Sequence, residues 1–577
     1  MSKIKFCALG GLGENGKNCY VVTVDERIFV LDVGLKYPSA ELFGIDSIVP
    51  DITYLVENRD KICGIFLSHG HMENIGGIIE VITKTEAPIY TTHFTASIVE
   101  IMIADANLKV SDYKIYRIND DKILKFGDVT VSFFNTSHSI PESLGISINT
   151  VDGSVVYAPD FTFSPSNDVR YRTSFNKITD ISRNKTLILC SESLGCLNFV
   201  RANNDYTFEH TVNEILKQGK RVIFSMFSSN LNRIQKVIDL CVAHNKKIAI
   251  IGRKTQITVN AAMNIGYVKI PNDNLVNLKY ITNDNKNDSD DLAIIITGLR
   301  HEPYYMLIRM LTNQDRLIQL KQDDNVVIVS PPVVGTEKIA TKTKDALNRL
   351  GCKITSISKK SLKSSHASSE DLKMMYQLLS PKYIIPIVGE YRHQYQQKSV
   401  AISAGFNSKD IIMLDNGNEI TFVDGVLQEG ISKNPVGDVL IDGSIVGDIN
   451  EVVLKDRELL SESGALICCV NINSNKRTIV SGPKIVARGF VPQAIIGDIV
   501  ENLENVAFDI VKKMIKKKSI DWNELKNSLK DGISKEIIDS TNKNPVVIPL
   551  IIDMCEEEIF ENKFEEYNNE KINELWN

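Results

Sequence analysis

The strongest constraint on the fold of this chain is a set of four polar side chains, each of which follows an apolar, β-branched run. His69 and His71 come directly after the run GIFL, inside the segment LSHGHMENIGG (67–77). His138 lies just after the run VTVSFFN, and Asp160 lies just after SVVYA. A lone His or Asp in apolar surroundings is costly without partners. The four strand ends therefore indicate residues that are partnered with one another or with a shared ligand.

These residue types suit a metal ion. Zinc binds imidazole nitrogen and carboxylate oxygen, and an H-x-H pair at a strand-to-loop junction turns both rings toward one ion. A catalytic site then needs a third protein ligand and an open position for water. Taken singly, each residue is more often a satisfied structural side chain, but four of them in order favour coordination. We therefore predict a metal centre, and the alternative is a relic cluster that binds no ion.

The spacing of apolar runs predicts an α/β protein built of several parts. The first 200 residues alternate short β-branched runs with Gly and Asn turns, which predicts a sandwich of sheets. From about residue 208 helices alternate with strands, which predicts a parallel sheet of βαβ units. Strand-like runs return between 350 and 425, and a Gly- and Asp-rich stretch (424–448) predicts a linker with turns. A compact α+β segment with an acidic helix at its end follows, and the polar stretch 282–291 predicts a surface loop.

The apolar runs give the strands and helices expected in each part of the chain. The expected strands of the first part are KIKFCAL, NCYVVTV, RIFVLDV, GIFLSH, VTVSFFN, SVVYAPD and TLILCSE. The second part is expected to have the helices FEHTVNEILKQGK, NLNRIQKVIDLCVAHN, VNAAMNIG and MLIRMLTNQ, and the strands RVIFSMF, KIAIIG, LAIIITG and NVVIVSPP. The expected strands of the third part are KYIIPIVGE, DIIMLDNG and EITFVDG.

The glycines of GLGENG, at positions 11, 13 and 16, have the spacing of a dinucleotide-binding loop. That loop must open a helix whose N-terminus faces the pyrophosphate. The segment that follows, KNCYVVTVDERIFVLDVG, instead indicates two strands and a hairpin. We therefore expect a tight strand connection here and no nucleotide site.

Composition limits the partners and the compartment. The chain has 577 residues, of which 43% are apolar and 24% are charged, as is typical of a globular protein with several domains. Its net charge of −6 excludes a chain that is basic throughout, so a polyanion site must be a local cleft or patch. Ten cysteines without a C-x-x-C pair favour a reducing compartment. Since no apolar run approaches the roughly 20 residues of a membrane span, we expect a cytoplasmic protein without membrane contact.

Several long segments together resemble the bacterial ribonuclease J family. They are ALGGLGENGKN, VLDVGLKYP, LFGIDSIVPDITYL, GIFLSHGHMENIGG, TSHSIPESLGI, SSNLNRIQKVID, SSHASSEDLKMM, PKYIIPIVGEYRH and KNPVVIPLIIDM. The resemblance implies an α/β fold: a metallo-β-lactamase αββα sandwich with an inserted β-CASP domain, plus a small C-terminal α+β domain. The implied division is 1–207 for the first part of the sandwich, 208–360 for the β-CASP domain, 361–425 for the completion of the sandwich, 426–455 for a linker and 456–577 for the C-terminal domain.

Active members of this family are expected to hold two metal ions. By position, the resemblance assigns the first ion to His69, His71, His138 and the bridging Asp160, and all four are present. Asp160 and His138 are also the implied catalytic residues if the protein is active. The second ion would need Asp at 73, His at 74 and His at 388, where this chain has Glu73, Asn74 and Val388.

These three differences predict that the second metal site is lost. Glu73 adds a methylene, which moves its carboxylate further than metal geometry tolerates, Asn74 is a weak neutral donor, and Val388 cannot coordinate. Two ions about 3.5–4 Å apart are needed to clamp the attacking and leaving oxygens of a phosphodiester. We therefore expect at most one Zn²⁺ and a large loss of nuclease activity. The alternative is an active 5′–3′ exo-/endoribonuclease that uses one zinc or a substitute divalent ion.

The resemblance also implies residues that bind RNA or its phosphates. They are Ser364, His366 and Ser368 in SSHASSEDL, Arg233 in SSNLNR and Arg392 in GEYRH. The serine-rich loop fits a helix N-cap equally well, with Ser368 or Ser369 capping EDLKMMYQLL. Leu299, Arg300 and His301 stand where the family has small residues, and they either crowd a 5′-phosphate pocket or add cationic contacts.

The function that follows from the resemblance is RNA processing and degradation. With the second metal site lost, we expect an RNA-binding subunit with a regulatory or scaffolding role. Its expected partners are RNA and other subunits, in a homo-oligomer or in a hetero-oligomer with an active ribonuclease J paralogue.

Overall fold

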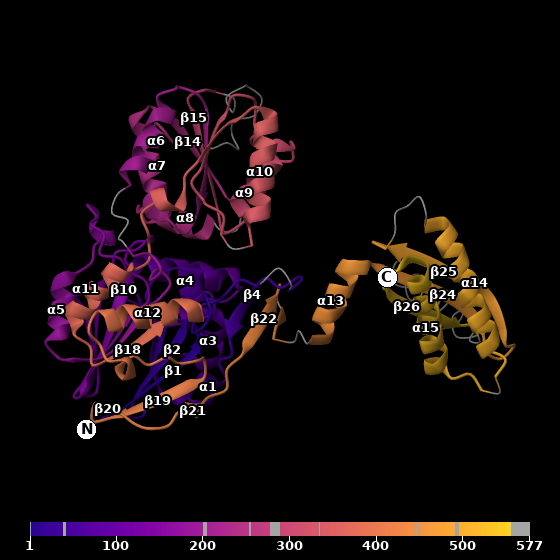
Figure 1. Cartoon of the computed structure of the whole chain (residues 1–577), viewed down its shortest axis with the longest axis horizontal. Helices are drawn as coiled ribbons and strands as arrows, with labels where there is room; N and C mark the ends of the chain where they lie inside the picture. Colours follow the sequence, from indigo (N-terminus) through magenta and orange to yellow (C-terminus); the bar gives the residue numbers. More distant parts are fainter. Residues whose placement is uncertain are drawn as a thin grey trace, which may run out of the picture. The chain divides into compact units, whose positions relative to one another are not determined.

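The computed structural model describes residues 2–38, 42–199, 205–252, 256–276, 289–333, 335–443, 445–447, 451–490, 496–517 and 519–554. The chain forms two compact units, one of residues 1–39 and 46–443 and the other of residues 40–45 and 444–577. Figure 1 labels their elements along the chain. The predicted acidic helix after residue 554 and most of the predicted loop 282–291 lie outside the described residues.

The larger unit begins with a mixed sheet. Its middle strands β2 and β3 are buried along almost their whole length, which is typical of strands covered on both faces. Neighbours from β19 to β3 pair antiparallel, and neighbours from β3 to β7 pair parallel. In order across the sheet, the strands are β20 (Val426–Leu427), β19 (Asn418–Val423), β1 (Lys3–Gly10), β2 (Cys19–Val24), β3 (Arg27–Leu31), β5 (Ile62–Phe66), β6 (Ile89–Thr91) and β7 (Ile115–Arg117), with β21 (Ser432–Lys433) also on β19.

A second sheet combines strands from both ends of the larger unit. In order it contains β18 (Tyr383–Ile387), β12 (Thr186–Glu192), β11 (Gly153–Ala158), β10 (Leu144–Thr150), β9 (Val129–Asn135) and β8 (Ile123–Phe126). β12 lies parallel to β11 on one side and to β18 on the other. The chain therefore leaves the sheet after β12, forms an inserted body, and returns to complete the sheet with β18.

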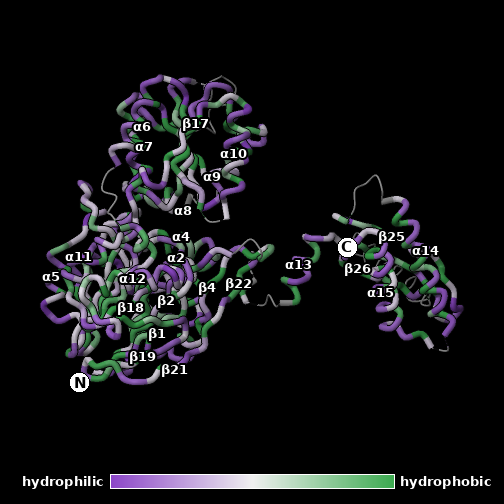
Figure 2. Tube along the Cα trace, viewed as in Figure 1, coloured by the Kyte–Doolittle hydropathy of each residue, from purple (hydrophilic) through white to green (hydrophobic). Residues whose placement is uncertain are grey.

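The two sheets pack face to face between two layers of helices. Phe29 and Phe66 of the first sheet share one core with Phe133, Tyr157 and Ile385 of the second. The outer face of the first sheet packs against α1 (Thr53–Glu57), α3 (Ile78–Thr85) and α4 (His93–Asp105), and that of the second against α5 (Phe175–Ser182), α11 (Ser369–Leu379) and α12 (Tyr391–Ser403). In Figure 2 the strands around β1, β2 and β18 are hydrophobic. The predicted αββα sandwich is confirmed.

The inserted body is a parallel sheet with helices on both faces, as the alternation of helices and strands predicted. Its strands are, in order, β14 (Lys247–Ile251), β15 (Leu292–Gly298), β13 (Val222–Phe227), β16 (Asn325–Ile328) and β17 (Lys353–Ser356), all paired parallel. One face packs against α6 (Tyr206–Leu216), α7 (Leu231–Ala243) and α8 (Gln256–Asn264), and the other against α9 (Glu302–Leu311) and α10 (Glu337–Leu350). Figure 1 shows the two helix layers on opposite sides.

Two segments differ from their predictions. DIIMLDNG is not a strand, because only Ile411 forms a bridge, to Ile384 of β18. The next ladder bond on that edge would need an N–H from Pro386, which has none. Residues 424–443, predicted as linker turns, instead add β20, β21 and β22 (Asp438–Asp442) to the larger unit, and β22 pairs with β4 (Ser47–Pro50). The predicted residue boundaries of the domains stay predictions.

The GLGENG segment makes a tight connection, as predicted. Gly11, Gly13 and Gly16 all have positive φ, and the element that follows is β2, a strand. Glu14 forms a bridge to Gly389, so the loop contacts the return segment after β18. No helix opens here to receive a pyrophosphate.

The smaller unit is an α+β fold, as predicted for the C-terminal segment. β24 (Ala465–Asn473) lies between β25 (Thr478–Arg488) and β26 (Val546–Asp553), and β23 (Ile445–Val446) and α13 (Glu451–Ser463) precede them. One face of this sheet packs against α14 (Ile496–Met514) and α15 (Trp522–Thr541) through an apolar core. None of the helices within the described residues has the length and apolar character that a membrane crossing requires.

Candidate metal centre

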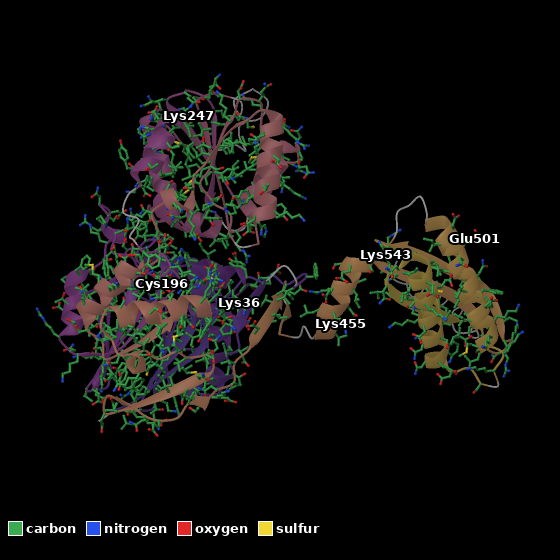
Figure 3. The ribbon with its side chains drawn as sticks, viewed as in Figure 1. Lys36, Cys196, Lys247, Lys455, Glu501 and Lys543 are labelled. Carbon is green, nitrogen blue, oxygen red and sulfur yellow. The ribbon has the colours of Figure 1, made fainter. Side chains whose placement is uncertain are left out.

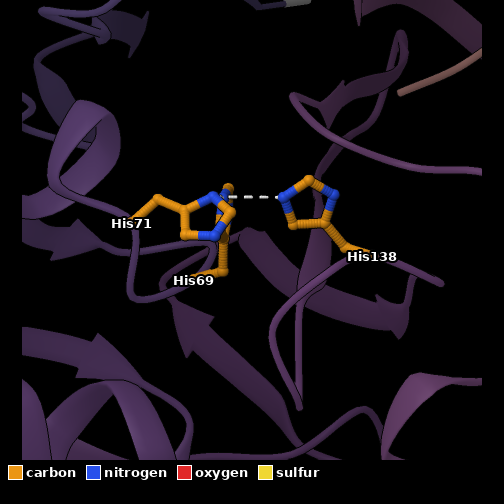
Figure 4. Close-up of side chains that lie close together, drawn as sticks. All are labelled: His69, His71 and His138. Atoms are coloured by element: carbon orange, nitrogen blue, oxygen red, sulfur yellow. Dashed lines mark hydrogen bonds between the residues drawn. The ribbon is translucent and has the colours of Figure 1, made fainter. Parts of the chain in front are cut away.

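The four polar residues that follow apolar runs meet at one end of the sandwich. His69 follows β5, His71 is the N-cap of the short α2 (Met72–Ile75), His138 follows β9 and Asp160 follows β11. His71 Nδ1 lies 3.1 Å from both His69 Nε2 and His138 Nε2, and Figure 4 shows the three rings turned toward one point. Asp160 Oδ2 is 3.5 Å from His69 Nε2. All are buried except His71, which is half-buried.

In two of the rings, the partner of the outward nitrogen determines which ring nitrogen carries the proton. His71 Nε2 lies 3.1 Å from the carbonyl oxygen of Ser229, and His138 Nδ1 lies 2.7 Å from that of Ser365. A carbonyl oxygen only accepts, so each of these nitrogens carries the proton. In neutral rings, His71 Nδ1 and His138 Nε2 are therefore both unprotonated, although they face each other. Two lone pairs at this distance repel unless a cation lies between them.

His69 follows the same logic. Its Nδ1 is 2.9 Å from Ser68 Oγ, and Ser68 donates its own proton to Asp32 Oδ2 at 2.7 Å. His69 Nδ1 therefore donates to Ser68, and its Nε2 presents a third lone pair to His71. Burial is the largest effect that lowers the pKa of His69 to about 3, and burial also holds the pKa of His138 well below its usual value. Three imidazole lone pairs that converge in this way fit a bound cation.

Asp160 completes this donor set. His366 Nδ1 lies 2.9 Å from both Glu192 Oε2 and Asp160 Oδ1, but its single proton is directed at Glu192. Asp160 Oδ1 is therefore buried without a hydrogen bond. Burial alone would raise the pKa of Asp160, yet the neighbouring ring of His366, followed by those of the other histidines, outweighs it and holds the pKa below its usual range. A buried carboxylate with an unpaired oxygen beside three lone pairs fits a metal ligand.

The positions that would bind the expected second ion lack a comparable set of ligand atoms. Asn74 is buried, and its amide nitrogen donates to Asp32 Oδ2 at 2.7 Å. Val388 is buried, and its side chain has no atom that can bind a metal ion. Among the described residues, the clusters of three or more ligand-type side chains within 4.8 Å of one another are His69–His71–His138 and Asp160–Glu192–His366, and Glu73 belongs to neither.

Val388 also has an unusual backbone. Its φ of 51° lies in the left-handed region, which costs roughly 1–2 kcal/mol and is rare for a β-branched residue. Its N–H donates to the Tyr20 hydroxyl at 3.2 Å, and its carbonyl accepts from Ser193 Oγ at 2.6 Å. Gly389 follows with φ of 123°. The neighbours therefore impose a loop shape that the Val388 side chain itself disfavours.

A cleft of about 960 Å³ opens over the metal centre, within the larger unit. His71 and Asp160 of the sandwich line one side, and residues of the inserted body line the other. Of the three bulky residues at 299–301, Leu299 and Arg300 line the cleft. The Arg300 guanidinium stands 5.6 Å over the ring of Tyr37. Arg300 therefore both narrows the cleft and adds a positive charge to it.

The structure separates the predicted RNA-binding residues. Those that line the cleft are Ser364, His366, Ser368 and Arg233. Ser368 is the N-cap of α11 and forms a capping box with Asp371, so its hydroxyl is engaged. Arg233 is enclosed and donates to the Lys363 carbonyl at 3.1 Å. Arg392 does not line the cleft: it is exposed at the start of α12 and lies 2.5 Å from Glu390.

Two buried carboxylates of the site were missed in the sequence. Glu192 ends β12, and its Oε1 accepts from the backbone N–H groups of Phe161 and Ala367, both at 2.9 Å. Burial raises its pKa to about 7. Asp32 directly follows β3 and supports the Ser68–His69 hydrogen bonds. The signal that could have found them is the same one that found His138 and Asp160, an acidic or imidazole side chain at the end of an apolar strand.

The fold and the site together define a protein of the metallo-β-lactamase class with an inserted body over a candidate metal centre. Four family profiles match: metallo-β-lactamase superfamily at residues 12–187, ribonuclease J β-CASP domain at 219–347, Zn-dependent metallo-hydrolase RNA specificity domain at 356–409 and ribonuclease J C-terminal domain at 452–554. The chain belongs to the ribonuclease J family.

Individual relatives agree with this assignment. Ribonuclease J 2 of Staphylococcus aureus (strain NCTC 8325 / PS 47) is 34% identical over 551 residues, which are 95% of this chain and 98% of that protein. Ribonuclease J2 of Bacillus subtilis (strain 168) is 34% identical over 553 residues, 96% of this chain and 99% of that protein. A crystal structure of a protein of unknown function from Enterococcus faecalis has a TM-score of 0.49 at 14% identity, over 73% of this chain and all of that one, a likeness too weak to add to the assignment.

Proposed function

We propose that this protein binds RNA in the cleft, holds at most one divalent ion at His69, His71, His138 and Asp160, and has lost most or all nuclease activity. The observation that carries the proposal is the contrast between the two metal positions. Three imidazole lone pairs and an unpaired carboxylate oxygen converge at the first. At the second, Asn74 donates to Asp32 and Val388 offers no donor.

Zinc suits an imidazole-rich donor set, and an ion held there would supply Lewis-acid polarisation of a phosphodiester. The chain's own residues do the positioning. Glu192 fixes the His366 ring by accepting from Nδ1, so the other edge of that ring is available to a phosphate in the cleft. Arg233 and Arg300 add cationic groups to the same cleft, and the Ser364 hydroxyl holds the loop by donating to the His366 carbonyl at 2.9 Å. RNA binding therefore survives in this scheme without the second ion.

The role that fits such a protein is that of a regulatory or scaffolding subunit in the cytoplasm, paired with an active paralogue. The homo-oligomer is the alternative assembly. One observation favours a second candidate function, a slow one-metal ribonuclease: the first donor set is complete. The two candidate functions predict different nuclease activities for the purified chain when no paralogue is present.

The deciding experiment measures degradation of 5′-monophosphorylated RNA by the purified full chain, free of any paralogue. We expect wild type and His71→Ala to be equally close to background. The triple variant Glu73→Asp, Asn74→His, Val388→His should gain activity by at least about tenfold, because it restores the second set of ligands and with it the two-ion clamp. Adding His71→Ala to the triple variant should abolish that gain.

The proposal is overturned if the wild-type chain degrades the RNA at a rate that His71→Ala abolishes. That result would establish the one-metal ribonuclease instead. Binding of the same RNA, measured with wild type in the presence of EDTA, tests the RNA-binding part separately. Absence of binding would remove that part of the proposal.

A further inference from the structure

Two tyrosines at the start of α12 expose their rings to solvent. Tyr391 and Tyr395 are each 60% exposed. They are four residues apart, so they lie on the same face of the helix. Their ring centroids are 6.4 Å apart and the ring planes differ by 31°. Neither residue has a part in the metal centre.

This turn of α12 is connected to the edge of the cleft. Val388, three residues before Tyr391, lines the cleft. Cys196, labelled in Figure 3, donates its thiol to the carbonyl of His393 in the same helical turn. Leu194 and Asn198, on either side of Cys196, line the cleft. The turn that carries the exposed rings is therefore joined to the lining of the cleft through Val388 and through the segment around Cys196.

Positive charges lie on this turn and in the lining of the cleft. Arg392 sits between the two tyrosines in the chain, and its side chain is 63% exposed. Lys359 and Lys360 line the cleft. Arg392 also lies beside Glu390, at 2.5 Å. Tyr391, Arg392 and Tyr395 thus place a cation between two exposed rings, beginning three residues after a position that lines the cleft.

We propose that Tyr391 and Tyr395 form a stacking site for bases of single-stranded RNA, with Arg392 beside its phosphates. This inference rests on the proposed RNA binding and deepens it. Because every base has a π-face, such a site tolerates any sequence.

The surroundings favour RNA over a protein partner. The core of a protein interface is apolar and poor in charge. On α12 the exposed neighbours of the tyrosines are Arg392 and Ser399, with Gln396 and Lys398 half-exposed. The profile of the RNA specificity domain also spans this helix, at residues 356–409.

The test measures anisotropy of labelled 5′-monophosphorylated RNA with the full chain, using oligomers of about 5 and about 15 nucleotides, since ssRNA sites span roughly 4–16. We expect the short RNA to end within the cleft and the long one to reach α12. We expect the double variant Tyr391→Ala, Tyr395→Ala to bind the long RNA about tenfold or more weakly and the short RNA unchanged. The double variant to Phe should keep wild-type affinity, because stacking needs only the ring.

Tyr116→Ala is the matched control. Tyr116 is 47% exposed and stacks on Tyr90 at 5.0 Å, but it does not line the cleft, so its loss should leave both affinities unchanged. Arg392→Gln should lower the slope of log affinity against log salt by about one for the long RNA only. Thermal unfolding of each variant checks that the fold is intact.

The stacking inference is overturned if the double Ala variant binds the long RNA within about twofold of wild type, or loses both RNAs equally. A shift in oligomeric state without a change in RNA affinity would mark the face as a protein contact and would also overturn it. If wild type binds neither RNA, the proposed function itself fails. This failure of the proposed function can be told apart from failure of the stacking inference, because it is seen with the wild-type chain and needs no variant.

Discussion

At the scale of single residues, the substitution at position 74 leaves its surroundings satisfied. Asp32 is fully buried, and its carboxylate accepts from the Ser68 amide, the Ser68 hydroxyl, the Tyr157 hydroxyl and Asn74, at 2.6–2.7 Å. Burial raises its pKa to about 6 in spite of these donors. Because the Asn74 amide supplies one of them, the loss of a ligand-type residue here does not orphan a buried carboxylate. The fold tolerates the change even though a metal site would not.

Ser368 allows a prediction that separates helix capping from phosphate binding. Its hydroxyl donates to Asp371 and accepts from the Asp371 amide, which closes the capping box of α11. Ser368→Ala should lower the free energy of unfolding by about 1 kcal/mol, whereas Ser368→Gly should lower it by only a few tenths. Urea unfolding measures both. RNA affinity should be unchanged in both variants, because the hydroxyl is already engaged.

An equal loss of RNA affinity in the Ala and Gly variants would contradict this account. It would place the Ser368 hydroxyl on the RNA, as the resemblance to the family implied. Ser369→Ala is the neighbouring control, since its hydroxyl donates to the Cys196 carbonyl and does not cap the helix.

The sequence identified the residues whose local pattern is distinctive. His69, His138 and Asp160 each follow an apolar run, and the structure brings them together. Glu192 carries the same pattern but was missed, because it belongs to no ligand set that the family resemblance implies. Arg392 was expected near phosphate, and its exposed place on α12 depends on the tertiary fold, which sequence spacing does not encode.

At the scale of elements, the parallel sheet of the inserted body depends on a buried ion pair. Arg221, just before β13, and Asp324, just before β16, have side chains 1% exposed. Arg221 Nε and Nη2 donate to the two carboxylate oxygens at 2.8 and 2.6 Å. Such a two-pronged pair holds the starts of two neighbouring strands together.

Breaking this pair should destabilise the larger unit strongly. Asp324→Ala leaves a buried, uncompensated guanidinium, so we expect roughly 3–5 kcal/mol loss in the free energy of unfolding. Lys220→Ala is the matched control, because Lys220 is the residue before Arg221 and pairs with Asp290 at the surface. Its loss should change the free energy of unfolding little. Denaturant unfolding followed by circular dichroism compares the two. Equal midpoints for Asp324→Ala and wild type would contradict the prediction.

The elements were predictable wherever the spacing of apolar residues followed one pattern, that of a helix or that of a strand. The helices and strands of 206–356 alternate regularly, and their parallel sheet follows from that pattern. DIIMLDNG has a strand-like composition, yet Pro386 on the facing edge of β18 stops the ladder after one bridge. Residues 424–443 are rich in glycine, but their partners β19 and β4 lie far away in the sequence, so their pairing was not visible locally.

At the scale of the whole molecule, charge is concentrated where the proposed function needs it. The chain is acidic overall, with net charge −6. The cleft nevertheless has more basic than acidic side chains: Arg233, Arg300, Lys359, Lys360 and Lys363 against Glu73, Asp160 and Asp371. A local basic cleft in an acidic protein is suited to a polyanion that binds at one place only.

The central claim, that one metal position survives and the other is lost, is tested most directly by the number of zinc ions bound per chain. Equilibrium dialysis of the purified full chain followed by elemental analysis gives this number. We predict no more than one ion for wild type, none for His71→Ala and two for the triple variant Glu73→Asp, Asn74→His, Val388→His, since affinity requires the full donor set. Two ions in the wild-type chain would contradict the account.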